Sequence, residues 1–478
     1  MQAIVTPEYM QKKELDAFNS GLDPKDAMFK AGTHVFEIAK NYKNVLIVAG
    51  CGNNGGDGFC CGSLLKEAGV KTDIFVVGDI NKLSEQSKYF YDACLPLLTD
   101  IIKDDYDLVI DAILGIGFKR TLEGEFLKAV NLINSFKYKA CILSVDIPSG
   151  LNGLIGEGDV CVNADITVTF QAKKLGHIIN KGTDFVGNLI VKDIDIPLIP
   201  LIYEPEISDI IPLLPQIKNT VHKGNLGNIG VIAGSSGMEG AAILATKALT
   251  KMCVGKITLA VEKNIINNFS LRVPEVMVAN RDDLGEFIKD KNVILFGCGI
   301  GRNDDNKKIL EFLLKNSTCP LVIDADGLYF LNKEILKQAQ CPVILTPHLK
   351  EASRLFDCPI NDLITDPVNI TCDFAKETKV TVFLKSNYNF ITDSNQKYLC
   401  NFGTKGMAKG GSGDVLAGIT AGAVNLTKSN LSGCLLASFI HGFAGKEAQN
   451  EKTEYSMTPS DIIDNIYKAF KELKKEAR

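Results

Sequence analysis

The chain has 478 residues, of which 46% are apolar and 23% are charged, and its formal net charge is −5. This length exceeds what one hydrophobic core usually organises, so two or three domains are expected. The small acidic excess, without a long Lys/Arg block before the C-terminal helix, argues against nucleic acid as a partner and leaves small molecules.

Targeting signals and metal-binding cysteines are not expected. No apolar run approaches the roughly 18 residues that a membrane-spanning helix needs, and residues 1–18 lack the charged-then-apolar pattern of a secretory signal. The 14 cysteines include no C-x-x-C pair. Several, such as Cys94 and Cys298, sit in apolar stretches, as small buried residues do in a reducing compartment. We therefore expect a cytoplasmic protein with no zinc site and no membrane partner.

The N-terminal half alternates helical and apolar stretches. Residues 14–40 indicate helices interrupted at 21–24, and residues 44–50 form the continuous apolar run typical of a parallel strand buried on both faces. This alternation predicts an α/β fold with a Rossmann-like, doubly wound sheet. The later predicted elements are a helix to about 68, strands at 71–77, 108–111 and 141–146, and helices at 84–99 and 127–137.

A change of pattern separates the two halves. Residues 194–216 contain five prolines, which break any helix, so we place the domain junction near Pro215. The predicted domains are residues 1–215 and 216–478. The second domain is again α/β, with a helix from Ala241, and two helices and a tail that follow the glycine-rich loop beginning at Gly403. Its predicted strands lie at 227–234, 256–261, 293–296, 320–323, 342–345 and 380–384.

The glycine-rich stretch 403–418 is the strongest single signal in the second half. Closely spaced glycines let backbone N–H groups approach a ligand, and a helix starting there adds its dipole, which predicts an anion cradle. Asp414 is unexpected beside a phosphate, because a carboxylate is repelled there unless it handles a proton, a hydroxyl or a metal. The alternative is a flexible loop with an acidic N-cap.

Three loops in the first half carry polar side chains at the carboxyl ends of predicted strands, where open α/β sheets bind ligands. Residues 50–55 match the dinucleotide pattern G-x-G-x-x-G, and Asp79 sits at the spacing of a ribose acid. Asp57, predicted where the helix begins, would repel a pyrophosphate. Asn54, Asp111 and Ser149 offer oxygen ligands that suit a hard cation, although each could instead cap or form a turn.

Residues 52–58 (GNNGGDG), 111–117 (DAILGIG) and 146–151 (DIPSGL) resemble the YjeF N-terminal family, the NAD(P)H-hydrate epimerases, over about residues 10–210. The resemblance implies a hydrated nicotinamide as substrate and one potassium ion held by Asn54, Asp111 and Ser149. Asp146 is the expected acid–base group, with Lys119 assisting. The implied substrate contacts are Asn53, Asn54, Gly55, Gly56, Asp57, Gly115, Ile116, Gly117, Phe118, Lys119, Arg120, Thr121 and Asp146.

The second half is similar to the ribokinase-like NAD(P)H-hydrate dehydratases over about residues 217–470. The motifs that carry this similarity lie at 223–235, 237–242, 297–301, 324–328, 346–351 and 410–414. Implied substrate contacts are Ala241, Gly299, His348, Glu351, Arg354 and Asp414. Implied nucleotide contacts are Lys385, Ser386, Asn387, Tyr388, Asn389, Thr404, Lys405, Gly406, Met407, Ala408, Lys409, Gly410, Gly411, Ser412 and Gly413.

Some positions depart from this second pattern or remain open. Cys298, Lys350, Ser386 and Lys409 stand where the family usually has proline, glycine, glycine and threonine, and the two lysines would add positive charge near the phosphate and substrate loops. A lone histidine after a strand is more often structural, but the motif around His348 favours a substrate contact. Asp324 and Asp326 either face a metal or form a turn.

Together the two resemblances predict a bifunctional repair enzyme for NADH hydrate and NADPH hydrate. The first domain would interconvert the R and S epimers. The second would remove water from the S form by transferring a phosphoryl group from ADP, or ATP, to its hydroxyl. Mg²⁺ would be bound mainly by the nucleotide phosphates, and Asp414 would accept the hydroxyl proton. The resemblance favours ADP, and we expect a homo-oligomer.

Three alternatives remain open. One is a ribokinase-like small-molecule kinase fused to a nucleotide-binding domain, which a stable phosphorylated product would reveal. Another is a nucleotide-binding module without turnover, and a Rossmann dehydrogenase is the third.

Overall fold

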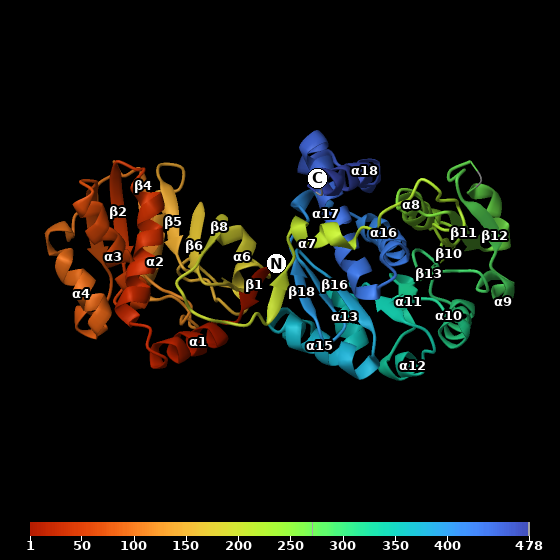
Figure 1. Ribbon diagram of the computed structural model, residues 1–478, viewed down its shortest axis with the longest axis horizontal. Coiled ribbons are helices and arrows are strands. Elements are labelled where there is room, and N and C mark those ends of the chain that lie inside the picture. Colours follow the sequence, from red (N-terminus) through yellow and green to blue (C-terminus); the bar gives the residue numbers. More distant parts are fainter. Residues whose placement is uncertain (270, 477–478) are drawn as a thin grey trace. The chain divides into compact units, whose positions relative to one another are not determined.

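The computed structural model describes residues 1–269 and 271–476 and divides into two compact α/β units, one at Gln2–Leu201 and one from Ile202 onward (Figure 1). The two-domain α/β fold predicted from the sequence is confirmed. The division lies earlier than the predicted junction near Pro215, because β9 (Ile202–Glu204) pairs with β18 (Lys397–Cys400) and Ile210 belongs to the core of the second unit.

A six-stranded sheet with the order β3-β2-β4-β5-β6-β8, parallel throughout, forms the centre of the first unit. Its strands are β2 (Asn44–Ala49), β3 (Lys71–Val76), β4 (Leu108–Ala112), β5 (Cys141–Val145), β6 (Ile166–Phe170) and β8 (Asn188–Lys192). Two short strands, β1 (Gln2–Val5) and β7 (Lys173–Lys174), pair in parallel apart from it. The helices are α1 (Pro7–Asn19), α2 (Pro24–Ala39), α3 (Asn53–Glu67), α4 (Glu85–Ala93), α5 (Gly124–Asn134) and α6 (Gly182–Phe185).

Helices cover both faces of this sheet, which explains why its central strands are apolar along their whole length. Val45 and Ile47 of β2 pack in one core with residues of α2 and α3. Leu46 and Val48 of the same strand pack in a second core with residues of α5. Because β2, β4 and β5 are parallel neighbours in the sheet, their carboxyl ends lie side by side at one edge, as the sequence predicted.

Two predicted helices of the first unit differ from the structure. The helix predicted at 84–99 ends at Ala93 and is followed by the 3₁₀ turn Leu95–Leu97, because Pro96 lacks the N–H that a longer helix requires. Helix α3 begins at Asn53, so Asp57 lies in its second turn and is buried rather than at its N-terminus.

In the second unit the sheet has the order β12-β11-β10-β13-β14-β15-β16-β17-β18-β9. It is parallel from β12 to β16 and antiparallel through the hairpin of β16, β17 and β18. The further strands are β10 (Asn228–Ile232), β11 (Lys256–Val261), β12 (Met277–Asn280), β13 (Val293–Phe296), β14 (Leu321–Ile323), β15 (Val343–Leu345), β16 (Thr381–Lys385) and β17 (Asn389–Thr392).

Helix α16 (Ser412–Thr427) is the most deeply packed helix of this unit. It contacts α8 (Glu239–Thr250), α17 (Asn430–Ser456) and β13. Three helices, α16, α17 and α18 (Pro459–Glu476), close the described chain where the sequence predicted two. The remaining helices are α7 (Ile207–Ile210), α9 (Leu284–Phe287), α10 (Asp304–Asn316), α11 (Asp326–Tyr329), α12 (Lys333–Lys337), α13 (Leu349–Phe356), α14 (Ile360–Thr365) and α15 (Pro367–Thr378).

Within the described residues, none of these helices combines the length and apolarity that crossing a bilayer requires.

Candidate active sites

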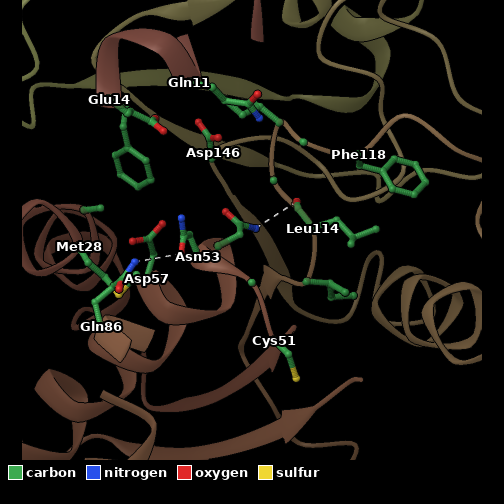
Figure 2. Close-up of a pocket in the computed structure, with 18 of the residues that line it drawn as sticks. Gln11, Glu14, Met28, Cys51, Asn53, Asp57, Gln86, Leu114, Phe118 and Asp146 are labelled. Atoms are coloured by element: carbon green, nitrogen blue, oxygen red, sulfur yellow. Dashed lines mark hydrogen bonds between the residues drawn. The ribbon is translucent and has the colours of Figure 1, made fainter. Parts of the chain in front are cut away.

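A cavity of about 880 Å³ opens at the carboxyl edge of the first unit's sheet (Figure 2). The loops after β2 and β4 and the residue that follows β5 line it, together with one face of α1. Most of the predicted epimerase contacts line it directly: Asn53, Asn54, Asp57, Gly115, Ile116, Gly117, Phe118, Lys119, Arg120 and Asp146. Thr121 lines a smaller neighbouring cavity with Phe118 and Arg120.

Tight backbone packing fixes the first of these loops. A Cβ on Gly55 would lie 1.8 Å from the carbonyl oxygen of Gly50, so only glycine permits this approach of α3 to the end of β2. Asn54 then reaches the next loop, where its Nδ2 donates to the carbonyl of Leu114 at 3.1 Å. Its Oδ1 is buried without a hydrogen-bond partner among the described residues.

The three predicted cation ligands are brought together. Asp111 is fully buried and accepts hydrogen bonds from Ser149 Oγ at 2.6 Å, Ser149 N at 2.8 Å and Ser144 Oγ at 2.8 Å. Burial raises the pKa of Asp111, although these donors oppose the shift. The buried Asp111 carboxylate and the unpartnered Asn54 Oδ1 are oxygen donors of the kind that a hard cation takes.

Asp146 projects into the same cavity from a strained turn at the end of β5. Its φ is 64°, a left-handed conformation that aspartate tolerates better than most residues. Its Oδ1 accepts from Lys174 Nζ at 2.6 Å and from Thr169 Oγ1 at 2.9 Å. Burial alone would raise the pKa of Asp146, but the charge and hydrogen bond of Lys174 outweigh it and hold the pKa below its ordinary value.

Three other predicted residues that line this cavity are exposed. Lys119 is exposed and its Nζ contacts Glu8 Oε1 at 2.6 Å. Asn53 Oδ1 accepts from Ser84 and Gln86. Asp79, the predicted ribose acid, accepts from the backbone and side chain of Asn81 and so caps a 3₁₀ turn.

In the second unit, the predicted phosphate cradle lies at the N-terminus of α16. Gly411 caps the helix with a φ of 97°, and the Oγ of Ser412 is buried without a hydrogen-bond partner among the described residues. A Cβ on Gly413 would lie 3.4 Å from the Nζ of Lys385. A helix N-terminus, a free buried hydroxyl and an adjacent ammonium group together favour an anion.

Asp414 lies in the first turn of the same helix and has a perturbed pKa. Burial, followed by the nearby charge of Asp324, raises the pKa of Asp414 to about 6, while the Cys298 thiol and Lys385 oppose the rise. Asp324 is itself buried and bonded to Lys385 Nζ at 2.7 Å. A carboxyl group with a pKa near neutrality can take up a proton and release it at physiological pH.

Asp324 and Asp326 have different surroundings. Asp324 pairs with Lys385, whereas Asp326 accepts from the backbone N–H of Gly301 at 3.0 Å and from Arg302 Nε at 2.8 Å. Asp326 therefore holds the loop that contains Gly301 and Arg302. Among the described residues, no group of three or more His, Cys, Asp or Glu side chains gathers to hold a metal.

Two predicted nucleotide segments flank the cradle. Ser386, Asn387 and Tyr388 form the turn of the β16–β17 hairpin, and Asn389, which begins β17, donates to Ser438 Oγ on α17 at 3.0 Å. Residues 404–409 are fastened to α17. Gln449 Oε1 accepts from Thr404 Oγ1 at 2.5 Å and from Gly406 N at 3.0 Å.

Two lysines of the second segment already have partners. Lys405 pairs with Glu454. The ammonium group of Lys409, which replaces the family's usual threonine, donates to the carbonyls of Tyr455 and Met457, so in this structure it anchors the loop to the end of α17.

The predicted substrate contacts of this unit occupy neighbouring loops. Gly299 approaches α8 so closely that a Cβ on it would lie 2.9 Å from Ala241 Cβ. His348 caps α13 through its Nδ1, and Glu351 Oε2 accepts from His348 N at 3.0 Å. Arg354 donates to the carbonyls of Leu328 and Tyr329.

Family models match both halves of the chain. The model described as YjeF-related protein N-terminus matches residues 25–176, and the model described as NAD(P)H-hydrate dehydratase matches residues 229–468. Bifunctional NAD(P)H-hydrate repair enzymes from Coxiella burnetii and Thermofilum pendens are 31% and 30% identical to this chain. The alignments cover 95% of the chain in both cases, and 97% and 94% of the relatives. The chain belongs to the family of bifunctional NAD(P)H-hydrate repair enzymes.

Solved structures share the fold of the second unit. A ribokinase-like superfamily protein from Enterococcus faecalis is 25% identical, with a TM-score of 0.52 over 58% of this chain and 98% of its own. An ADP/ATP-dependent NAD(P)H-hydrate dehydratase from Bacillus subtilis, co-crystallised with ATP and Mg²⁺, shares the fold at 24% identity. Its TM-score is 0.53 over 57% of this chain and 99% of its own. The predicted ribokinase-like fold is confirmed.

Several residues of the two sites in this family member escaped the sequence analysis. Glu14 and Lys174 line the first cavity, and Gln449 holds the loop at 404–406 that was predicted to contact the nucleotide. His441, on α17, is buried, and burial lowers its pKa to about 4, so it is neutral where it meets the backbone of Ser412. None lies within a glycine-rich or strand-end motif, so no local pattern marked them.

Proposed function

We propose that this chain repairs hydrated NADH and NADPH in two steps, one in each unit. The first unit interconverts the R and S epimers of the hydrate, and the second removes water from the S form using ADP or ATP. The observation that carries the proposal is the placement of Asp414, a half-buried carboxyl group in the first turn of a helix whose N-terminus offers a free hydroxyl and Lys385.

The dehydration step needs an activated leaving group, because hydroxide leaves a carbon atom slowly. Ionised Asp414 would accept the proton of the substrate hydroxyl as that oxygen attacks the terminal phosphorus of the nucleotide. The phosphorylated oxygen then leaves as phosphate, and loss of the neighbouring ring proton restores the double bond. The α16 N-terminus and Lys385 would stabilise the phosphate charge during the transfer.

Magnesium would enter with the nucleotide, since no three-residue metal cluster forms among the described residues. Bound Mg²⁺ neutralises charge on the phosphate oxygens. The nearest carboxylates are Asp414, Asp324 and Asp326, and the last two already have ion-pair partners.

Asn54, Asp111 and Ser149 would hold potassium in the first unit, because the unpartnered Asn54 Oδ1 and the buried Asp111 carboxylate suit such an ion. Bound potassium would supply a fixed positive charge that steadies the loops and attracts polar oxygens of the substrate. Asp146, kept ionised by Lys174, would accept a substrate proton during epimerisation, with Lys119 at the cavity opening. A cytoplasmic location and a homo-oligomer remain our predictions.

A single assay tests the whole proposal. The purified chain is incubated with K⁺, Mg²⁺ and a chromatographically analysed R/S mixture of hydrated NADH, with ADP, with ATP, or without nucleotide. We expect R/S interconversion without nucleotide, and complete recovery of reduced-nicotinamide absorbance with at least one nucleotide. A stable phosphorylated product in place of NADH would instead support a small-molecule kinase.

A further inference from the structure

Three carboxyl groups share a single buried ammonium group in the cavity of the first unit. Glu14 on α1, Asp57 on α3 and Asp146 after β5 all line the cavity, as does Lys174 on β7. Each of the three carboxyl groups interacts electrostatically with at least one of the others. If all three were ionised, two negative charges would remain uncompensated in a cavity that is only partly accessible to water. The arrangement therefore favours at least one neutral carboxyl group.

Lys174 forms an ion pair with Asp146. Its side chain is 1% exposed, and its Nζ donates to Asp146 Oδ1, to Thr169 Oγ1 at 2.9 Å and to the carbonyl of Phe170 at 3.1 Å. These three acceptors use all three protons of the ammonium group. Asp146 is therefore the carboxylate that stays ionised, and Glu14 and Asp57 must share the cavity with it without a cation of their own.

Glu14 is the carboxyl group that can carry a proton to the substrate. Figure 2 shows its carboxyl group and that of Asp146 turned toward one another inside the cavity. Glu14 is half-buried, whereas Asp57 is buried in the second turn of α3. Burial, followed by the negative charge of Asp146, raises the pKa of Glu14 to about 7, and Lys174 only partly opposes this. Burial and the charges of Asp146 and Glu14 raise the pKa of Asp57 well above its usual range.

We propose that Glu14 is the general acid of epimerisation and acts opposite Asp146 as the general base. The inference rests on the proposed function of the first unit. It adds a catalytic residue from a helix that contains none of the motifs discussed above.

The proton balance closes in both directions. Asp146 accepts the proton of the C6 hydroxyl while the C6–N1 bond breaks. The electron pair of that bond goes to N1, which takes a proton from Glu14, and C6 becomes an aldehyde. After the aldehyde turns over, N1 returns its proton to Glu14 and attacks the opposite face of C6, and the oxygen recovers its proton from Asp146. Both carboxyl groups end as they began, and the hydroxyl oxygen is never released, so no dehydration occurs.

The decisive variant is Glu14→Gln, which preserves size and polarity but carries no transferable acid proton. The assay uses the full chain, K⁺ and isolated R epimer without nucleotide, and follows the S epimer by chromatography from pH 5 to pH 9. We expect wild-type kcat/KM to fall as pH rises through about 7, where Glu14 loses its proton. Glu14→Gln should lower kcat by at least about 100-fold, a typical general-acid contribution, and should abolish that fall. Glu14→Asp should restore part of kcat and the pH dependence.

Asp16→Asn is the matched control, because Asp16 lies on the same helix but is exposed and contacts Lys13. It should behave as wild type, and nucleotide-dependent dehydration of the S epimer should remain normal in every variant. The charged groups that face Glu14 are Asp146, Asp57 and Lys174, with the Lys119–Glu8 pair at the opening.

The results separate the possible failures. A Glu14→Gln chain that interconverts the epimers within about threefold of wild type overturns the inference. So does one that loses activity but keeps the fall near pH 7, since the acid would then be Asp57. A wild-type chain that fails to convert the R epimer at all overturns the proposed function of this unit, and the role of Glu14 with it.

Discussion

Replacing Asp414 with Asn tests the central chemical claim about the second unit. Asn keeps the size of the side chain and can still donate and accept hydrogen bonds, but it cannot take the proton of the substrate hydroxyl. Loss of a general base typically lowers a rate by about 100- to 10,000-fold. We expect a fall in kcat of that size for nucleotide-dependent dehydration of the S epimer.

The size of the fall in dehydration rate with pH is a second prediction for the wild-type chain. With its pKa raised to about 6, about nine tenths of Asp414 is ionised at pH 7 and about one tenth at pH 5. Dehydration should therefore fall about tenfold between these values. An aspartate at its ordinary pKa would remain mostly ionised over the same range and would give a nearly flat profile.

The assay follows absorbance recovery from isolated S epimer with saturating ADP and Mg²⁺, and repeats the series with ATP. Epimerisation by the same preparation reports that the first unit is intact. Asp305→Asn, at an exposed position on α10 that contacts Lys308, is the matched control. Dehydration by Asp414→Asn within a few-fold of wild type, or a flat wild-type profile from pH 5 to pH 7, would refute the reasoning.

Three further changes have defined outcomes. Lys174→Met removes one partner of a buried ion pair, so hydrogen exchange should show β5 and β6 destabilised by about 3 kcal/mol at pH 7. Because the folded-state pKa of Asp146 is lowered, the ion pair stabilises the fold at pH values above the unfolded pKa. The difference in unfolding free energy between the variant and wild type should therefore shrink as pH falls below about 4. A difference that stays constant with pH would contradict this. Gln449→Ala removes the acceptor of Thr404 and Gly406 and should raise KM for the nucleotide about tenfold, with kcat little changed. Replacing K⁺ by tetramethylammonium should slow epimerisation and leave dehydration unaffected; equal loss of both would argue against a cation at Asn54 and Asp111.

The alternation of apolar and helical stretches sufficed to predict an α/β fold in both halves and a parallel sheet in the first, because strands buried on both faces are apolar along their whole length. The loops after β2, β4 and β5 could likewise be placed at one edge, since carboxyl ends of neighbouring parallel strands coincide. Strands β17 and β18, the internal strand β6 and the edge strands β8, β9 and β12 were missed. Edge strand β8 is only partly buried, so its sequence lacks a continuous apolar run.

Charge and proton affinity could not be predicted in the same way. Asp414 could be placed at a helix start from its glycines, but its raised pKa depends on burial in the fold and on the charge of Asp324, which the fold brings to it from another loop. Lys174 occupies a two-residue strand without any motif, and Glu14 sits on a helix whose pattern shows only that one face is buried. The partners that set a carboxyl group's chemistry come from distant parts of the chain, and local patterns do not show them.

The two units shift their carboxyl groups in ways that set opposite pH limits on the two reactions. With the proposed roles, dehydration needs ionised Asp414 and should weaken below pH 6, whereas epimerisation needs protonated Glu14 and should weaken above pH 7. The composition of the hydrate that remains during repair of an R/S mixture with ADP therefore reports which step is limiting. Near pH 5.5, epimerisation outruns dehydration, and the residual hydrate should keep its equilibrium R/S ratio. At pH 8.5, the S form is consumed faster than it is replaced, so the hydrate that remains should become enriched in the R epimer. Samples without nucleotide give the equilibrium ratio at each pH. Enrichment of the R epimer at the acidic end would mean that the proton requirements are assigned to the wrong units.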